Sequence, residues 1–177
     1  MKKGFTLVEM LVVITILGIL MAMMIPAAGM ILKRAKVAQA KADAGVVASV
    51  MLKYFAEYNR VPGFYVDEAK AGNPHLTDVN WVEVMSPVPG GIPNKDNMKR
   101  VIFFEGGGGS VGDGKSEFPG AFIDPWGKRY EYQVDEDRDG NIANPKSTGE
   151  IRARSIAWSG GPDGLTATWE DNVTSWE

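Results

Sequence analysis

Three aspartates at alternate positions form the densest group of candidate metal ligands in the sequence. Asp135, Asp137 and Asp139 are followed by Gly140. This order matches the first half of an EF-hand loop, which has ligands at positions 1, 3 and 5 and a glycine at position 6. Position 12 of such a loop holds a bidentate glutamate, and here it is Lys146. The segment therefore predicts either a looser calcium loop or a polar hairpin turn.

A second motif fits the phosphate-binding pattern G-x-x-x-x-G-K-[ST], from Gly109 to Ser116. Such a loop needs a helix straight after its lysine, because the N-terminus of that helix faces the phosphates. Pro119 and Gly120 follow instead, and no helical spacing comes after them. The glycines therefore favour a surface loop, and we do not expect nucleotide binding.

Other catalytic chemistry finds little support in the composition. The chain has no cysteine, which excludes disulfides, thiolate metal sites and cysteine nucleophiles. Its single histidine, His75, lies in a predicted loop without a partner base or a cluster of metal ligands. The formal net charge is -3, so no large basic surplus is present to neutralise a phosphate backbone. We therefore expect neither an enzyme nor a nucleic-acid-binding protein.

The apolar residues are concentrated in the first third of the chain. Every residue from Met10 to Leu32 is uncharged. As a helix this run would be about 35 Å long, enough to cross a bilayer core of about 30 Å. A cleavable secretory signal has a shorter apolar region, of about 7–15 residues. The run therefore predicts a transmembrane helix over residues 5–32.

The helical pattern continues beyond this run. Apolar side chains recur at spacings of three and four from Val37 to Tyr58, with charged residues between them. We therefore predict one helix from Phe5 to Asn59, roughly 80 Å long. Pro26 lies inside it and cannot donate a backbone hydrogen bond, so we expect a kink or local loosening there.

The residues before the apolar run read Lys2-Lys3-Gly4-Phe5-Thr6-Leu7-Val8-Glu9. This segment, with the apolar run that follows, resembles the leader of type IV prepilins and type II secretion pseudopilins. The resemblance implies that a prepilin peptidase cuts between Gly4 and Phe5 and that Phe5 is then N-methylated. It also decides the orientation in the membrane, because basic residues flank the apolar run on both sides and leave the charge rule undecided.

Glu9 corresponds to a glutamate of that family, and its position has physical meaning. Burying an unpaired carboxylate in a membrane costs roughly 2–3 kcal/mol or more, so an intramembrane acid is a functional candidate. In a filament, the free amine of a neighbouring subunit's Phe5 could neutralise it. The alternative is that Glu9 lies among lipid headgroups and only marks the interface.

The rest of the chain predicts a small α+β domain. We expect a short helix or turn at residues 80–85, a buried strand at 101–104, and alternating strands at 129–135 and 151–159. Strands that follow a helix favour an antiparallel sheet packed on the second half of that helix. The expected organisation is a leader at 1–4, a transmembrane and assembly helix at 5–32, and an extracytoplasmic domain at 33–177.

Two further segments resemble the major pseudopilins of type II secretion. They are Asp124-Pro125-Trp126-Gly127-Lys128-Arg129-Tyr130 and Ser159-Gly160-Gly161-Pro162-Asp163-Gly164 with the acidic stretch around Asp171. The resemblance implies a pilin-like fold. It also implies calcium in the C-terminal loop at Asp163 and Asp171, although Asn172 stands where an aspartate is frequent. Asp135, Asp137 and Asp139 form the alternative calcium site.

The expected function is that of a structural subunit of a type IV pilus-like or type II secretion pseudopilus filament. Its expected partners are copies of itself or other pilins, the prepilin peptidase, an inner-membrane assembly platform and membrane lipid. The expected location is the inner membrane, crossed once, with the C-terminal domain in the periplasm or outside the cell, and then the filament. The alternative is a membrane-tethered, monomeric calcium-binding domain.

Overall fold

The computed structural model describes residues 5–63, 74–91, 93–105 and 110–176, without the side chains of residues 23–28 and 110. The chain separates into two compact units that divide between Lys36 and Val37. The first unit holds the N-terminal part of α1 (Leu7–Tyr58). The second holds the end of that helix and every strand.

The long helix confirms the prediction from the apolar spacing to within two residues at each end. It ends where Asn59 takes a left-handed backbone conformation with φ 52°, which asparagine tolerates better than most residues. The amide of Asn59 still donates to the carbonyl of Phe55 at 2.8 Å. Pro26 lies inside α1, but its side chain is outside the described ones, so the kink stays a prediction.

The core of the second unit forms on one face of the helix. Ala44, Val47, Met51 and Tyr54 recur at spacings of three and four and are all fully or almost fully buried. They pack in one cluster with aromatic side chains from α3 (Val79–Met85) and from the strands. The second half of the helix thus supplies one wall of the domain core, as the apolar spacing predicts.

One antiparallel sheet of four strands completes that core, in the order β1-β4-β7-β8. Its central pair runs in register from Glu131 opposite Trp158 to Val134 opposite Ser155. Two short hairpins, β2-β3 and β5-β6, lie outside this sheet. The strands are β1 (His75–Leu76), β2 (Ser110–Val111), β3 (Phe122–Ile123), β4 (Glu131–Val134), β5 (Ile142–Ala143), β6 (Glu150–Ile151), β7 (Ser155–Ser159) and β8 (Val173–Thr174).

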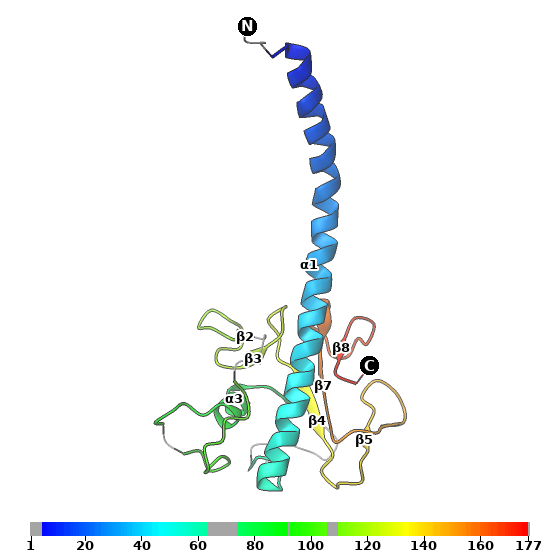
Figure 1. The fold of residues 1–177 in the computed structure, drawn as a ribbon. Helices are drawn as coiled ribbons and strands as arrows, with labels where there is room; N and C mark the ends of the chain where they lie inside the picture. The colour runs from blue at the N-terminus through cyan, green and yellow to red at the C-terminus, as the bar shows by residue number, and fades with distance from the viewer. Residues whose placement is uncertain (1–4, 64–73, 92, 106–109, 177) are drawn as a thin grey trace. The chain divides into compact units, whose positions relative to one another are not determined.

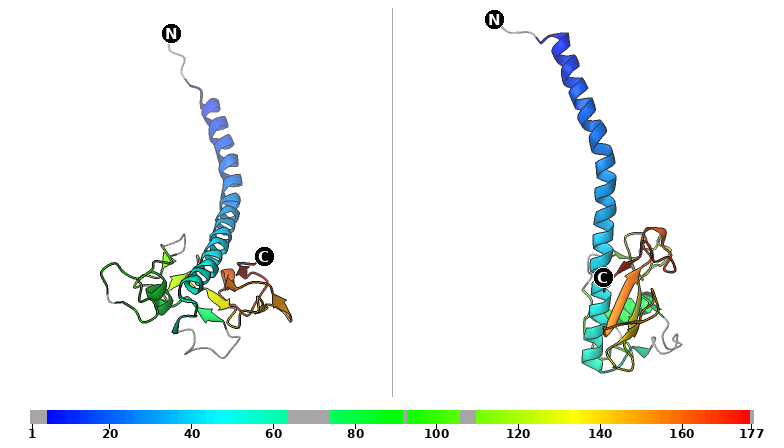
Figure 2. Two further views of the ribbon diagram at one scale, coloured as in Figure 1. Left: turned by 60° about the horizontal axis from the view of Figure 1, so that its bottom comes forward. Right: turned by 90° about the vertical axis from the view of Figure 1, so that its right-hand side faces the viewer.

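Strand β7 separates two hydrophobic clusters, because successive side chains of a strand point to opposite faces. Ala157 belongs to the main core against the helix. Ile156 and Trp158 face the other way and form a second cluster, with Trp169 and Trp176 packed against it. Within the second unit, Figures 1 and 2 show α3 and the β2-β3 hairpin on one side of the helix, and β5 and β8 on the other.

Two of the predicted strands are wrong: one does not form, and the other is divided in two. Residues 101–104 form no strand, because the amides of Phe103 and Phe104 both donate to the carbonyl of Met85 at the end of α3. The strand predicted at 151–159 is two strands, with Ile151 ending β6 and Ser155 starting β7. His75, expected in a loop, lies in β1 and is 95% buried, with 5% of its surface exposed.

Candidate functional site

The first turn of α1 is closed by Thr6 and Glu9. The amide and the hydroxyl of Thr6 both donate to Oε2 of Glu9 at 2.7 Å. In return, the amide of Glu9 donates to the hydroxyl of Thr6 at 3.3 Å. This reciprocal pair is a capping box, and a carboxylate there also interacts favourably with the helix dipole. The Thr-x-x-Glu spacing is the sequence signature of this box, which was not among the roles predicted for Glu9.

Apolar side chains surround this capped end. Phe5 is 68% exposed and Leu7 is 81% exposed. The large apolar residues that follow, up to Met21, are exposed as well. Gly4, the other predicted processing residue, lies outside the described residues. In the part of the chain that the structure describes, no helix combines the length and the apolarity needed to cross a membrane.

The glycine-rich segment that fits the phosphate-binding pattern does not lead into a helix. After Lys115 the amide of Ser116 donates to the carbonyl of Asp113, which closes a turn. Further turns and then β3 follow. Gly109 lies outside the described residues. The described part of the segment therefore lacks the helix N-terminus that would face a phosphate.

The segment from Asp124 to Tyr130 forms the turn between β3 and β4 and contacts α1. Asp124 is buried, and its Oδ1 accepts from the amides of Trp126 and Lys128 at 3.0 and 2.9 Å. At the other end, the hydroxyl of Tyr130 donates to Asp43 of α1 at 3.3 Å. Burial, helped by the Asp43 carboxylate, raises the pKa of Tyr130, so it stays protonated and can donate. The resemblance of this segment to pseudopilins therefore falls on residues that hold the fold together.

The C-terminal loop contains the predicted calcium ligands Asp163 and Asp171. Asp163 ends a short 3₁₀ helix (Gly161–Asp163) and is exposed. Its Oδ1 accepts from the amide of Leu165 at 2.8 Å and its Oδ2 from the hydroxyl of Thr168 at 2.6 Å. These two hydrogen bonds lower the pKa of Asp163. Both carboxylate oxygens of Asp163 thus already accept hydrogen bonds from within the loop.

Asp171 reaches the same region through its backbone. A Cβ added to Gly161, which has φ 67°, would lie 2.2 Å from the carbonyl oxygen of Asp171. Only glycine fits this close approach in a left-handed conformation. Asp163 and Asp171 line a surface hollow of about 490 Å³ together with Thr168, Trp169 and Glu170. The loop is therefore compact by its own contacts, and calcium binding there stays a prediction.

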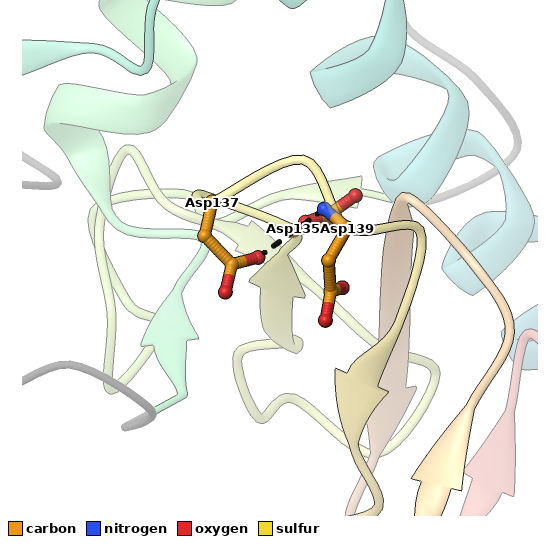
Figure 3. Close-up of side chains that lie close together, drawn as sticks. All are labelled: Asp135, Asp137 and Asp139. Carbon is orange, nitrogen blue, oxygen red and sulfur yellow. Dashed lines mark hydrogen bonds between the residues drawn. The ribbon is translucent and has the colours of Figure 1, made fainter.

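The alternative acidic group lies in the turn after β4. Carboxylate oxygens of Asp135, Asp137 and Asp139 all lie within 4.8 Å of one another. Figure 3 shows the three side chains together at this turn, with the amide of Asp139 donating to Asp137. Gly140 has φ 88°, and its amide donates to Oδ2 of Asp135 at 3.0 Å. Among the described residues this is the one such group of three candidate ligands.

The comparisons with known proteins agree with the predicted leader. Residues 1–25 match the prokaryotic N-terminal methylation motif. The chain is 28% identical to type II secretion system core protein G of Pseudomonas aeruginosa over 131 residues. This aligned region covers 74% of this chain and 72% of that protein. No solved structure matches the chain significantly. The predicted resemblance to pilin-type and type II secretion proteins is therefore confirmed.

Proposed function

We propose that this chain is a structural subunit of a pilus-like filament of the type II secretion kind. A prepilin peptidase would cut the precursor between Gly4 and Phe5 and methylate Phe5. The apolar segment from Phe5 to Leu32 would then anchor the subunit in the inner membrane and afterwards pack against other subunits. The methylation motif at residues 1–25, followed by an exposed apolar helix, is the observation that carries this proposal.

The exposure of the helix supports assembly. Soluble monomers rarely expose contiguous apolar patches larger than a few hundred Å². Here large apolar side chains are exposed over consecutive turns of the helix, from Leu7 to Met21. Such a surface is stable only when lipid or other apolar helices cover it. Lipid would cover it while the subunit is in the membrane, and neighbouring helices would cover it in the filament. The expected partners are therefore membrane lipid, copies of this chain or related pilins, and an inner-membrane assembly platform.

The capping box gives Glu9 a defined position for its second role. Thr6 occupies Oε2, and no hydrogen bond to Oε1 is found among the described residues. Cleavage would create a positively charged amine at Phe5, one turn before Glu9. A neighbouring subunit's amine can then pair with this carboxylate without displacing Thr6. Neutralising the acid in this way removes the cost of burying it in an apolar filament core.

Mass spectrometry of the membrane-extracted protein tests the proposal. We expect a mature chain that begins with N-methylated Phe5 when a prepilin peptidase is co-expressed. A Gly4→Leu variant should stay at full length, and an unprocessed wild-type chain under the same conditions would contradict the proposal. Cross-linking of single-cysteine variants along Leu7–Met21 should then give oligomer ladders only from the processed chain. The alternative of a monomeric tethered domain predicts processing without such ladders.

A further inference from the structure

We propose that the turn formed by Asp135, Asp137 and Asp139 is a binding site for a divalent cation of the calcium type. The proposal goes beyond the proposed function, because it concerns a turn of the second unit and not the apolar segment of α1. It starts from the geometry of the three carboxylates, whose oxygens approach one another to within 4.8 Å. A cation that takes oxygen ligands at about 2.3–2.6 Å fits between oxygens at this separation.

The second observation is a buried oxygen that the fold leaves without a partner. Asp135 is 5% exposed. Its Oδ2 accepts a hydrogen bond from the amide of Gly140, whereas its Oδ1 is fully buried and has no hydrogen-bond partner among the described residues. Burying an ionised carboxylate is costly unless it is paired or coordinates a metal. A bound cation would supply the missing interaction.

The three carboxylates form no ion pair with a basic side chain among the described residues. The ion pairs found there involve neither Asp135 nor Asp137 nor Asp139. Arg138 lies in the middle of the turn, but its guanidinium donates to the carbonyl of Asn59 at 2.9 Å and lies 5.0 Å from the ring centre of Phe55. The guanidinium of Arg138 therefore interacts with the end of α1 and not with the carboxylates of its own turn. Those carboxylates can bind a metal cation from solution.

A neighbouring cavity offers an alternative partner for the buried oxygen. It measures about 240 Å³ and is lined by Asp135, Arg154, Val134 and the helix residues Leu52, Phe55 and Ala56. A water molecule there could satisfy Asp135, but it would not remove the repulsion among three carboxylates. Only a cation relieves both, which is why we prefer the cation.

The ligand set indicates a weak site. The turn matches an EF-hand loop at positions 1, 3, 5 and 6, and Ile142 at position 8 is buried in β5 as part of a short strand pair. Position 12 is Lys146, so the bidentate ligand is missing and water must complete the coordination. Weak extracellular sites of this kind have dissociation constants of about 10⁻⁴–10⁻³ M.

Calorimetry on the full chain in detergent tests the site. Titration with calcium chloride should show one site, and the melting temperature should rise with the logarithm of calcium concentration. The double variant Asp137→Asn with Asp139→Asn should bind at least about tenfold more weakly. Its melting temperature without calcium should be higher than that of the wild type, because two repelling charges are gone. Both residues are exposed, so the variant should fold.

The matched control is Asp163→Asn with Asp171→Asn in the C-terminal loop, which should keep wild-type calcium affinity within about twofold. Loss of binding in this control with full binding in the Asp137 and Asp139 variant would overturn the proposal and move the site to the C-terminal loop. Absence of heat and of any melting shift in the wild type at about 10 mM calcium, well above the expected dissociation constant, would also overturn it. Sodium chloride at equal ionic strength should not reproduce the shift.

Discussion

The hydroxyl of Ser159 donates a hydrogen bond of 2.5 Å to Oδ2 of Asp124 and so joins the end of β7 to the turn between β3 and β4. The same hydroxyl accepts from the amide of Gly161, where the C-terminal loop begins. The two C-terminal segments that resemble pseudopilins therefore meet at one buried carboxylate. This shared junction gives both segments a structural role, because it joins the turn before β4 to the start of the C-terminal loop.

Asp124→Ala is expected to destabilise the domain by about 3 kcal/mol, because three hydrogen bonds to a charged, buried group are lost together. Ser159→Ala should cost about 1–2 kcal/mol. Chemical denaturation followed by near-UV circular dichroism measures both. The double variant should lose less than the sum of the two, since they share a hydrogen bond. The control Asp113→Ala, at an exposed turn residue, should change stability by less than about 0.5 kcal/mol. A similar loss in the control would contradict the assignment.

Two substitutions separate the capping role of Glu9 from its role in assembly. Glu9→Gln keeps the capping box, because glutamine can also accept from Thr6, but removes the charge. Thr6→Ala weakens the cap by about 1 kcal/mol and keeps the carboxylate. We expect Glu9→Gln to be processed normally and to form few filaments, and Thr6→Ala to assemble. Negative-stain electron microscopy with quantification of sheared filaments measures this. Full assembly of the glutamine variant would show that the cap alone matters.

Stability should depend on pH through His75, the single histidine of the chain. Burial disfavours the charged imidazole and lowers the pKa of His75 below its ordinary value of 6.5. Below pH 6.5 the unfolded chain therefore binds a proton that the folded chain does not bind until the pH is lower. The free energy of unfolding should fall as the pH drops through this range, with a limiting slope of about 1.4 kcal/mol per pH unit.

Thermal unfolding of the wild type and of His75→Phe between pH 7.5 and 5.5 checks this dependence. The phenylalanine keeps a ring at the position that lies 5.8 Å from the ring of Tyr132. Other groups titrate in both proteins, and burial raises the pKa of Glu131, so the difference between the two proteins is the informative quantity. As the pH falls, the free energy of unfolding of the variant should rise relative to that of the wild type. A difference independent of pH would rule out the contribution of His75.

The elements that the sequence predicted well are those with long periodic patterns. The helix ends within two residues of its predicted limits because apolar spacing persists over many turns. Strand β4 lies inside the predicted range 129–135 because Tyr130, Tyr132 and Val134 alternate toward one core. In these places the local pattern and the tertiary packing demand the same conformation.

The failures come from tertiary contacts that no short pattern contains. The run at residues 101–104 is apolar enough for a strand, but the amides of Phe103 and Phe104 both donate to the carbonyl of Met85 at the end of α3. Likewise, the strand predicted at 151–159 divides because Ile151 pairs with Ile142 of β5, whereas Ser155 pairs with Val134 of β4. Neither partner can be chosen from the sequence, because each lies in another segment with no pattern linking the two.

For the candidate metal sites, the sequence predicted calcium first in the C-terminal loop at Asp163 and Asp171, with the acidic turn as the alternative. The ranking depends on which oxygens are already occupied. Both oxygens of Asp163 accept hydrogen bonds within their loop, whereas one oxygen of Asp135 accepts none from the part of the chain that the structure describes. This difference arises from the folded backbone, which places the amides of Leu165 and Gly140 but leaves one carboxylate oxygen without a donor.

The two nested hairpins have a consequence for how the domain opens. The pair β5-β6 encloses residues 144–149, and the pair β4-β7 encloses residues 135–154. The inner pair is too short to persist alone, and its Ile142 is buried against Ile156 and Trp158 of the outer pair. Neither hairpin can therefore separate without exposing the cluster they share. Backbone amides of both should exchange with deuterium as one cooperative unit, more slowly than those of the exposed residues 136–139 between β4 and β5.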